Sequence, residues 1–447
     1  MHKTDVLIIG GSASGIVTAV TGKSIYPKKD FLIVRKEKQV VVPCGIPYIF
    51  GSLKDSSKNL IPDSVLEKAD VKFKIDEVTS IDTKKKICET ADGENIGYDK
   101  LVIATGSVSK IPHWLKGADK QNVFTIPKDK TYLDGLLEKL KDCTKIVTIG
   151  GGFIGVEISD ELNKCGKQVT IVEILPYVLS LAFDEDIATH AQETLKKRGV
   201  NIISGVGVEE IIGDQKASGV LLKNGETLDA DAIILSVGYK PNTTLAEKAG
   251  LQLNEKGFIK VDEYMRTGNP DIFAVGDCSE KRDFVTRKPS ELMLASTACA
   301  EARIAGMSLY KLSAVKTFSG TIAIFSTMIG TTGFGVAGLT EFVARREGFD
   351  IISGAFEGVD KHPGSLEGTN KQLVKLIVAR DSGIILGGEI IGGSSTGELT
   401  NILGLAIQNK MTVHCLLTYQ IGTHPLLTAP PTAYPIIKAA EVISKKM

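Results

Sequence analysis

The stretch KIVTIGGGFIGVE, residues 145–157, contains an apolar run of strand length, a glycine turn and the beginning of a helix. The stretch DVLIIGGSASG, residues 5–15, repeats this pattern near the N-terminus. Each is followed by a further apolar strand, at 31–34 and 168–172 respectively. Glycine permits the tight strand-to-helix turn and lets backbone N–H groups meet a pyrophosphate at the positive end of the helix. One such turn is a weak signal, but two in the same context predict two dinucleotide-binding folds.

The second copy carries the complete fingerprint, and an acidic residue follows it. Glu173 ends the next predicted strand, where a carboxylate accepts hydrogen bonds from both ribose hydroxyls and repels a 2′-phosphate. We therefore expect NADH in this fold, with NADPH left open. The fingerprint glycines are Gly150, Gly152 and Gly155.

The first copy departs from the fingerprint. Ser12 stands where a second glycine is usual, and its side chain is small enough to let the backbone approach a ligand. Arg35 and Lys36 follow the next strand, so Glu37 is the nearest carboxylate for a ribose and Arg35 is a candidate phosphate or adenine contact. The cofactor-binding residues predicted in this turn are Gly10, Ser12, Ala13 and Gly15.

Three further segments carry a family resemblance. YDKLVIATG (98–106) resembles the strand and turn that close the first half of a flavoprotein site, and SVGYKPN (236–242) resembles the return from an NADH domain. TGNPDIFAVGD (267–277) resembles the motif whose Asp accepts hydrogen bonds from the ribityl chain of FAD. Together with the two glycine turns, these segments resemble the pyridine nucleotide–disulfide oxidoreductases over the whole chain, which implies FAD and NADH as cofactors. The contacts implied in these segments are Thr105, Gly106, Gly238 and Asp277.

The resemblance implies an α/β fold with two Rossmann-like nucleotide-binding domains, for FAD and NADH, and an α+β C-terminal dimerisation domain. GLTE at 338–341 resembles the start of that last domain, and such proteins are usually homodimers whose active sites take residues from the partner. A helix expected over 292–304 would direct its start, near Ala295, at the flavin pyrimidine, where its dipole stabilises negative charge. The expected boundaries are 1–112 and 241–312 for the two parts of the FAD domain, 113–240 for the NADH domain and 313–447 for the dimerisation domain.

The segment VVVPCGIPY, residues 40–48, contains the predicted redox centre, Cys44. Two-cysteine reductases of this family carry a second cysteine five residues on, where this chain has Ile49. The resemblance is therefore to the single-cysteine subgroup of coenzyme A disulfide reductases, NADH oxidases and NADH peroxidases. Pro47 suits the first turn of a helix that begins near Cys44, and a thiol at a helix N-terminus has its pKa lowered toward the reactive thiolate. The residues expected against the flavin here are Pro43 and Gly45.

Two departures from the subgroup bear on the substrate. NADH oxidases and peroxidases typically carry a His at the position of Ala13, so the oxygen- or peroxide-reducing hypothesis loses its acid–base residue. Coenzyme A disulfide reductases usually have Ala there, which favours a small disulfide, persulfide or polysulfide as the acceptor. They also tend to have Ser and Asn just before the cysteine, whereas this chain has Val40 to Pro43, so coenzyme A stays open. The alternatives are an NADH oxidase or peroxidase, and an electron-transfer component that serves a protein partner.

Further site candidates lie outside the cysteine segment. His424 precedes a proline as in the two-cysteine reductases, where such a His supplies acid–base chemistry across the dimer. Tyr434 and Tyr419 flank a Pro-Pro sequence similar to one in the coenzyme A reductases, and His424 ranks before Tyr434. Phe153 stands in the second glycine turn, where related enzymes place an aromatic ring that covers the flavin until nicotinamide arrives; helix–strand packing is the alternative.

Composition limits the other functions. The 447 residues suggest about three domains, and 53 basic residues balance 53 acidic ones, so no net field favours nucleic acid or a membrane surface. No apolar run approaches the ~18 residues of a bilayer span, and the N-terminus does not resemble a targeting signal, so we expect a cytoplasmic protein. The seven cysteines form no CxxC pair, so we expect neither a disulfide framework nor a metal site, and most of them should be buried.

Overall fold

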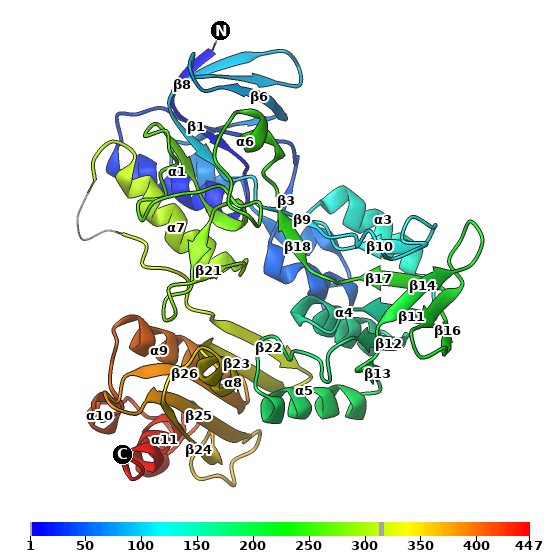
Figure 1. Cartoon of the computed structure of the whole chain (residues 1–447), viewed down its shortest axis with the longest axis vertical. Helices are drawn as coiled ribbons and strands as arrows, with labels where there is room; N and C mark the ends of the chain where they lie inside the picture. The colour runs from blue at the N-terminus through cyan, green and yellow to red at the C-terminus, as the bar shows by residue number, and fades with distance from the viewer. Residues whose placement is uncertain (1, 313–316) are drawn as a thin grey trace.

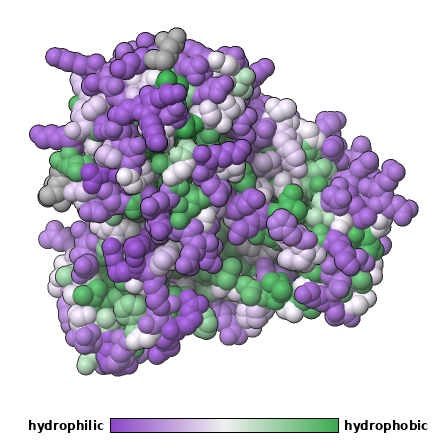
Figure 2. Space-filling model, turned by 45° about the horizontal axis from the view of Figure 1, so that its top comes forward, coloured by the Kyte–Doolittle hydropathy of each residue, from purple (hydrophilic) through white to green (hydrophobic). Residues whose placement is uncertain are grey.

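The computed structural model describes residues 2–312 and 317–447, and the chain forms three bodies that each contain their own sheet (Figure 1). The expected start of the C-terminal domain at residue 313 lies outside the described residues. Figure 2 shows one face that is mainly hydrophilic, with apolar side chains gathered in the recess between the upper and lower parts of the molecule. Within residues 2–312 and 317–447, no helix combines the length and the apolar character needed to cross a membrane.

The first body is built on a sheet with the strand order β5-β2-β1-β8-β7-β6, and β19 pairs with β8. Strands β2, β1, β8 and β19 at its centre are parallel and mostly buried, because their side chains form largely apolar runs. Helices α1 and α7 pack against each other beside this sheet. The bounds are β1 (His2–Ile9), α1 (Ala13–Ile25), β2 (Phe31–Arg35), β5 (Lys72–Ile75), β6 (Val78–Asp82), β7 (Ile87–Thr90), β8 (Asn95–Ile103), β19 (Ile272–Ala274) and α7 (Ala295–Ser308).

The second body repeats this architecture with a parallel sheet in the order β10-β17-β11-β12-β13 and an antiparallel sheet β14-β15-β16. The chain enters and leaves it through an antiparallel ribbon of β9 (Ser107–Ser109) and β18 (Tyr239–Pro241). The other bounds are β10 (Val123–Thr125), α3 (Lys130–Leu140), β11 (Lys145–Ile149), α4 (Phe153–Lys164), β12 (Gln168–Glu173), α5 (Glu185–Lys197), β13 (Asn201–Ser204), β14 (Val208–Ile212), β15 (Gly219–Leu222), β16 (Thr227–Asp229) and β17 (Ala232–Leu235).

The third body contains an antiparallel sheet in the order β22-β23-β26-β25-β24, with α9 and α11 packed against it. The predicted fold, two Rossmann-like domains and an α+β C-terminal domain, is confirmed. The bounds are β22 (Phe325–Ile329), β23 (Thr332–Gly338), α8 (Glu341–Arg346), β24 (Ile351–Val359), β25 (Lys371–Ala379), β26 (Ile385–Gly392), α9 (Thr396–Gln408), α10 (Val413–Thr418) and α11 (Pro435–Ser444). Short elements elsewhere include β3 (Val40–Val41), η1 (Pro43–Phe50), β4 (Leu60–Ile61), α2 (Ser64–Lys68), α6 (Thr244–Lys248), η3 (Gly276–Cys278), β20 (Lys281–Arg282) and β21 (Pro289–Ser290).

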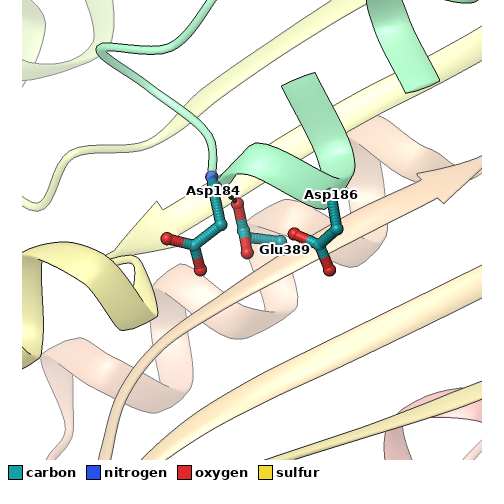
Figure 3. Close-up of side chains that lie close together, drawn as sticks. All are labelled: Asp184, Asp186 and Glu389. Carbon is teal, nitrogen blue, oxygen red and sulfur yellow. Dashed lines mark hydrogen bonds between the residues drawn. The ribbon is translucent and has the colours of Figure 1, made fainter. Parts of the chain in front are cut away.

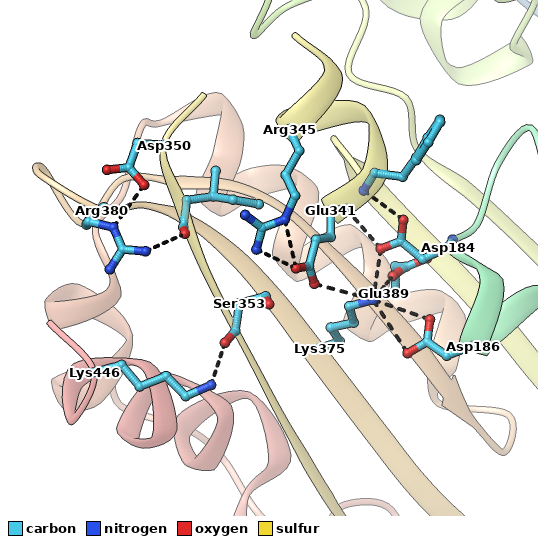
Figure 4. Close-up of polar contacts among 12 residues, drawn as sticks. Asp184, Asp186, Glu341, Arg345, Asp350, Ser353, Lys375, Arg380, Glu389 and Lys446 are labelled. Carbon is cyan, nitrogen blue, oxygen red and sulfur yellow. Dashed lines mark hydrogen bonds and ion pairs between the residues drawn. The ribbon is translucent and has the colours of Figure 1, made fainter. Parts of the chain in front are cut away.

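A polar cluster, buried except for Asp186, joins the second and third bodies at the start of α5. Figure 3 shows the carboxylates of Asp184, Asp186 and Glu389 turned toward one another. The ammonium of Lys375 lies among them, with its Nζ 2.8 Å from Asp184, 3.2 Å from Glu389 and 3.3 Å from Asp186 (Figure 4). The backbone N–H of Asp184 also donates to Glu389 over 2.7 Å. Lysine therefore supplies the positive charge that this acidic group requires.

Candidate functional site

The two glycine turns have the same backbone geometry. Gly10 has φ +108° and Gly150 has φ +106°, which favours glycine, and a Cβ at either would strike the neighbouring strand's backbone, at 2.2 Å and 2.7 Å. The helices begin at Ala13 and Phe153, so their first N–H groups face outward from the turn. A Cβ at Gly152 would meet no atom within 4 Å, so this turn is open to a ligand. Both turns fit the pyrophosphate of a dinucleotide.

The residue after each second strand distinguishes the two folds. Glu173 ends β12, and its carboxylate accepts hydrogen bonds from the N–H groups of Gly151 over 2.5 Å and Leu175 over 2.8 Å. It lies beside the glycine turn, where the prediction placed the ribose acceptor. Since Gly10 and Gly150 donate to Val34 and Val172 in the same way, Arg35 is the counterpart of Glu173 in the first fold.

Arg35 does not have the role that the sequence suggested. Its side chain is fully buried and pairs with Asp63 through Nη1 at 2.7 Å and Nη2 at 2.8 Å, while its guanidinium lies 4.7 Å from the centre of the Phe73 ring. Its methylene groups fill the space beside Gly11. Arg35 is therefore a packing residue and is not free to bind a phosphate or an adenine, whereas Glu37 is half-buried two residues beyond the strand.

The turn after β19 presents Asp277 as a hydrogen-bond acceptor. Its Oδ2 accepts from Ser107 Oγ and Lys128 Nζ, both at 2.7 Å. Burial acts to raise the pKa of Asp277, but the charge and hydrogen bond of Lys128 outweigh it and lower that pKa, so the group is ionised near neutral pH. A partly buried, ionised carboxylate at this position fits the hydroxyl-rich ribityl chain of FAD.

The neighbouring candidate residues lie on the same side of the first sheet's strand ends. Thr105 follows β8, and its hydroxyl donates to the carbonyl of Asn242 over 2.6 Å, which ties the two crossing segments together. Gly106 and Gly238 have φ values of +68° and +95°, as expected for turn glycines. The helix expected over 292–304 is α7, which begins at Ala295 and continues to Ser308.

Cys44 is the second residue of the 3₁₀ helix η1, and it is exposed in the single chain. The predicted helix start is confirmed, although Pro43 takes the first position and Pro47 lies inside. The predicted lowering of the thiol pKa is wrong for the chain itself. Although the residue is exposed, desolvation by the surrounding protein atoms and the charge of Glu157 raise the pKa of Cys44, and the positive charge of Lys128 only partly opposes them.

Gly45 is explained by a contact that the sequence did not suggest. A Cβ at Gly45 would lie 2.0 Å from Oδ1 of Asn59, whose Nδ2 donates to the carbonyl of Val42 over 3.0 Å. Asn59 is buried and thereby fixes the segment just before Cys44. The glycine makes room for this amide, which is a structural role independent of the flavin.

Glu157 and Lys128 are site residues that the sequence analysis missed. Glu157 lies on α4, which packs against η1, and Thr327 of β22 donates to it over 2.7 Å. Burial raises the pKa of Glu157 to about 7. The available signal was an acidic residue between two apolar residues, Val156 and Ile158, directly after the glycine fingerprint. For Lys128, which stands in the loop after β10, the local sequence gives no signal.

Phe153 packs against the third body. Its ring stacks on Phe325 of β22 with centroids 5.1 Å apart and an interplanar angle of 11°, and it meets Phe183 edge-on at 6.1 Å. This is the packing alternative of the sequence analysis, with the partner on a different domain. A gating movement of Phe153 stays a prediction.

The C-terminal candidates are not brought to Cys44 within one chain. His424 is exposed, whereas Tyr434 is buried and meets Tyr419 edge-on with ring centroids 6.4 Å apart. Burial raises the pKa of both tyrosines. Figure 1 places α10 and α11, which flank these residues, far from β3, which directly precedes the Cys44 segment. Any role for them in the site requires a second chain.

The cysteines are less buried than expected. All seven are free, and burial is complete only for Cys88 and Cys278, while Cys44, Cys165 and Cys415 are exposed. The prediction that most are buried is therefore wrong. Cys165 is exposed because it lies at the end of α4, and Cys415 is exposed because it lies on the short helix α10. Exposed thiols other than Cys44 provide useful controls.

Comparison with known proteins agrees with this geometry. The family model described as pyridine nucleotide-disulphide oxidoreductase matches residues 4–302, and that of the family's dimerisation domain matches residues 324–434. The chain is 30% identical to an NADH oxidase of Methanocaldococcus jannaschii, over 99% of both chains. It is 29% identical to an NAD(P)H coenzyme A polysulfide/persulfide reductase of Pyrococcus horikoshii, over 99% of this chain and 98% of the other.

Among solved structures, the NAD-dependent persulfide reductase from A. fulgidus superimposes with a TM-score of 0.90 at 28% identity. The match covers 99% of this chain and 83% of that one. The two glycine turns, the ionised Asp277 and the three-body architecture are thus found together in a chain that matches one family throughout. The protein belongs to the pyridine nucleotide-disulphide oxidoreductases and is an FAD-dependent NAD(P)H oxidoreductase.

Proposed function

We propose that the protein is an NAD(P)H-dependent reductase of small disulfides, persulfides or polysulfides in which Cys44 is the redox-active group. The observation that carries this proposal is an exposed thiol on η1. The thiol lies near enough to Lys128 and Asp277 for their charges to act on its pKa. Asp277 is also the acceptor that we assign to the FAD ribityl chain. FAD, when bound, supplies the two electrons that NAD(P)H donates as a hydride.

The proposed reaction is a thiol–disulfide exchange at Cys44. The Cys44 thiolate attacks one sulfur of R–S–S–R′, the S–S bond breaks, R′S⁻ leaves, and a Cys44–S–S–R mixed disulfide forms. Two electrons then cleave the mixed disulfide, which restores the Cys44 thiolate and releases RS⁻. Each released thiolate takes up a proton at neutral pH. With a persulfide, attack on the outer sulfur transfers that sulfur to Cys44 and releases the thiol.

Support for a sulfur substrate comes from the sequence and from the relatives. Ala13, the first residue of α1, replaces the His that the oxidases and peroxidases carry, so the site lacks that acid for peroxide chemistry. Relatives from three Pyrococcus species are named as coenzyme A-dependent sulfur, polysulfide or persulfide reductases. Coenzyme A stays open as a ligand of this chain.

The second candidate function is an NADH oxidase. Relatives from M. jannaschii and Enterococcus faecalis carry that name, at 30% and 29% identity. In this function oxygen or peroxide takes the electrons, and Cys44 either cycles through a sulfenic acid or takes no part. An electron-transfer component that serves a protein partner remains a further alternative.

We also propose a homodimer, supported by the match to the family's dimerisation domain. In this dimer, His424 of one protomer serves the Cys44 site of the other as the acid for the leaving thiolate, with Tyr434 as the second candidate. The exposure of His424 in the single chain is consistent with an interface residue. A cytoplasmic location stays a prediction.

The cofactor contacts are proposals of the same kind. In the second fold, Glu173 binds the adenosine ribose of NADH and Phe153 covers the flavin until nicotinamide arrives. For FAD, the acceptor of the ribose is Glu37, and the start of α7 at Ala295 faces the flavin pyrimidine. The domain boundaries at 112/113, 240/241 and 312/313 likewise stay predictions. The turn and strand-end contacts proposed are Gly10, Ser12, Ala13, Gly15, Pro43, Thr105, Gly106 and Asp277 for FAD, and Gly150, Gly152, Gly155 and Gly238 for NADH.

A pair of matched serine variants tests the proposed function. Cys44→Ser removes the nucleophile, and Cys165→Ser removes a thiol that is equally exposed but lies at the end of α4. With NADH and either inorganic polysulfide or a small disulfide, we expect Cys44→Ser to lose at least roughly a hundredfold in rate, because no mixed disulfide forms. Cys165→Ser should keep the rate of the original enzyme. Full disulfide- and polysulfide-reducing activity in Cys44→Ser would show that the proposed Cys44 mechanism is wrong.

A further inference from the structure

A buried ion pair lies directly behind the turn that carries Asp277. Glu301 on α7 is fully buried, and the side chain of Lys281 on β20 is 1% exposed. Their charged atoms lie 3.6 Å apart. Burial of a charge is costly unless partners compensate it, so a pair this deep requires an explanation in its contacts.

Both charged groups bind the same short turn, η3 (Gly276–Cys278), and the residue after it. Glu301 Oε2 accepts from the N–H of Gly276 over 2.7 Å and from the hydroxyl of Ser279 over 3.0 Å. Lys281 Nζ donates to the carbonyls of Gly276 and Ser279, each at 3.0 Å. Glu301 and Lys281 thus fix both ends of the turn. The Asp277 side chain extends instead toward Ser107 and Lys128.

The turn is also in tight contact with two helices. Gly276 has φ +80°, and a Cβ there would lie 2.7 Å from Ser14 Oγ on α1 and 3.6 Å from the Cβ of Ala298 on α7. Since α1 begins at the first glycine turn and α7 begins at Ala295, this turn contacts both helices whose starts we assign to FAD. A shift of the turn would therefore move Asp277 relative to both.

We propose that Glu301 and Lys281 are positioning residues for FAD, which hold the Asp277 carboxylate where the ribityl hydroxyls donate to it. The proposal rests on the assignment of Asp277 to the ribityl chain, but it does not depend on the final electron acceptor. A single carboxylate oxygen of Glu301 accepts both hydrogen bonds from the turn. The ammonium of Lys281 donates to two carbonyls of the turn and balances the charge of Glu301. Burial raises the pKa of Glu301, and the charge of Lys281 opposes this effect.

The test measures FAD release from the purified flavoprotein by the fluorescence of free FAD, with chain unfolding followed separately by circular dichroism. Glu301→Ala removes both hydrogen bonds, so release should accelerate by roughly tenfold or more, since a factor of ten corresponds to one such bond of about 1.4 kcal/mol. Glu301→Gln keeps an amide oxygen for the same two donors and should accelerate release by less than roughly threefold. Asp277→Asn reports on the ribityl assignment itself and should also accelerate release.

Lys281→Met and Lys375→Met form a matched control pair, because each removes a buried lysine that binds carboxylates. Both should lower the unfolding temperature, but only Lys281→Met should accelerate FAD release. If Glu301→Ala does not fold, Glu301→Gln/Lys281→Met leaves no buried charge at this place and should still release FAD faster, because the carbonyl contacts are gone. Equal FAD release in the original protein, Lys281→Met and the double variant would overturn the proposal. Accelerated release in these variants with an unchanged rate in Asp277→Asn would overturn the ribityl assignment on which it rests.

Discussion

Thr327 on β22 of the C-terminal domain donates a hydrogen bond of 2.7 Å to Glu157 on α4, in the second nucleotide-binding domain. Helix α4 in turn packs against η1, which carries Cys44. The acidic group that raises the pKa of the Cys44 thiol, our proposed redox centre, is therefore held by a residue more than a hundred positions away in the sequence. A chain of contacts thus links the C-terminal domain, through α4, to the segment that carries Cys44.

Replacement of Glu157 by Gln should lower the pKa of Cys44. The variant removes a negative charge that disfavours the thiolate, so Cys44 in the flavoprotein should be alkylated roughly threefold to tenfold faster at pH 8. Because the pKa of Glu157 is about 7, this advantage should be present above pH 7 and fade below it, where Glu157 is already protonated. Mass spectrometry of the Cys44 peptide after iodoacetamide treatment separates this thiol from the exposed Cys165 and Cys415.

Lys128→Met provides the opposite control for the same measurement, since Lys128 lowers the pKa of Cys44. In this variant, the Cys44 thiol should be alkylated more slowly than in the original protein. Equal rates in all three proteins would show that these charges do not act on Cys44.

Replacement of Glu173 by Ala should relax the preference for NADH. In the proposed ribose site, the Glu173 carboxylate at the end of β12, which lies beside the glycine turn, accepts hydrogen bonds from the ribose hydroxyls and repels a 2′-phosphate. We expect kcat/KM for NADH to fall roughly tenfold, because the hydrogen bonds to the ribose hydroxyls are lost. We expect kcat/KM for NADPH to rise, because the repulsion of the 2′-phosphate is lost as well. Steady-state rates with both nucleotides check this, and an unchanged ratio of the two kcat/KM values would remove Glu173 from the ribose site.

The polar cluster at the start of α5 should make stability depend on pH. Burial, together with the charge of Asp184, raises the pKa of Glu389 from 4.5 to about 8. A raised carboxyl pKa favours the protonated form in the folded chain, so the penalty of Glu389 is absent at pH 4 and grows as pH rises toward 8. Glu389→Gln should therefore raise the free energy of unfolding by roughly 1–3 kcal/mol at pH 8.5 and much less at pH 5.

Lys375→Met is the matched change in the opposite direction. Without its ammonium, the ionised carboxylate of Asp184 stays buried with no cation, so we expect a loss of about 3–5 kcal/mol near neutral pH. Urea unfolding at several pH values measures both variants. A stability gain from Lys375→Met at pH 8.5 would mean that the cluster does not carry these charges.

The parts of the fold that could be predicted are those encoded locally. The turns at Gly10 and Gly150 need a conformation that favours glycine, and Glu173 directly ends an apolar strand, so sequence neighbours suffice to place them. The position of Asp277 in a turn could be predicted for the same reason, because it follows a short apolar strand and a glycine that its turn requires.

The parts that could not be predicted depend on contacts distant in sequence. The burial of Arg35 requires Asp63 from a different element, and the stacking of Phe153 requires Phe325 from another domain. The pKa of Cys44 is shifted upward, opposite to the prediction. The prediction considered only the dipole of the local helix, whereas the charge of Glu157 comes from the second nucleotide-binding fold. No periodicity or spacing contains this information.

The insertion of one nucleotide-binding domain into the other has a consequence for synthesis. Strand β19 completes the first sheet beside β8, yet it follows the whole second domain in the chain. On the ribosome, the inserted domain has therefore emerged in full before the first sheet receives its last strand, and domains fold as units while the chain is made. We expect the NADH domain to fold first and the FAD domain to close afterwards, so that FAD binds late in biogenesis.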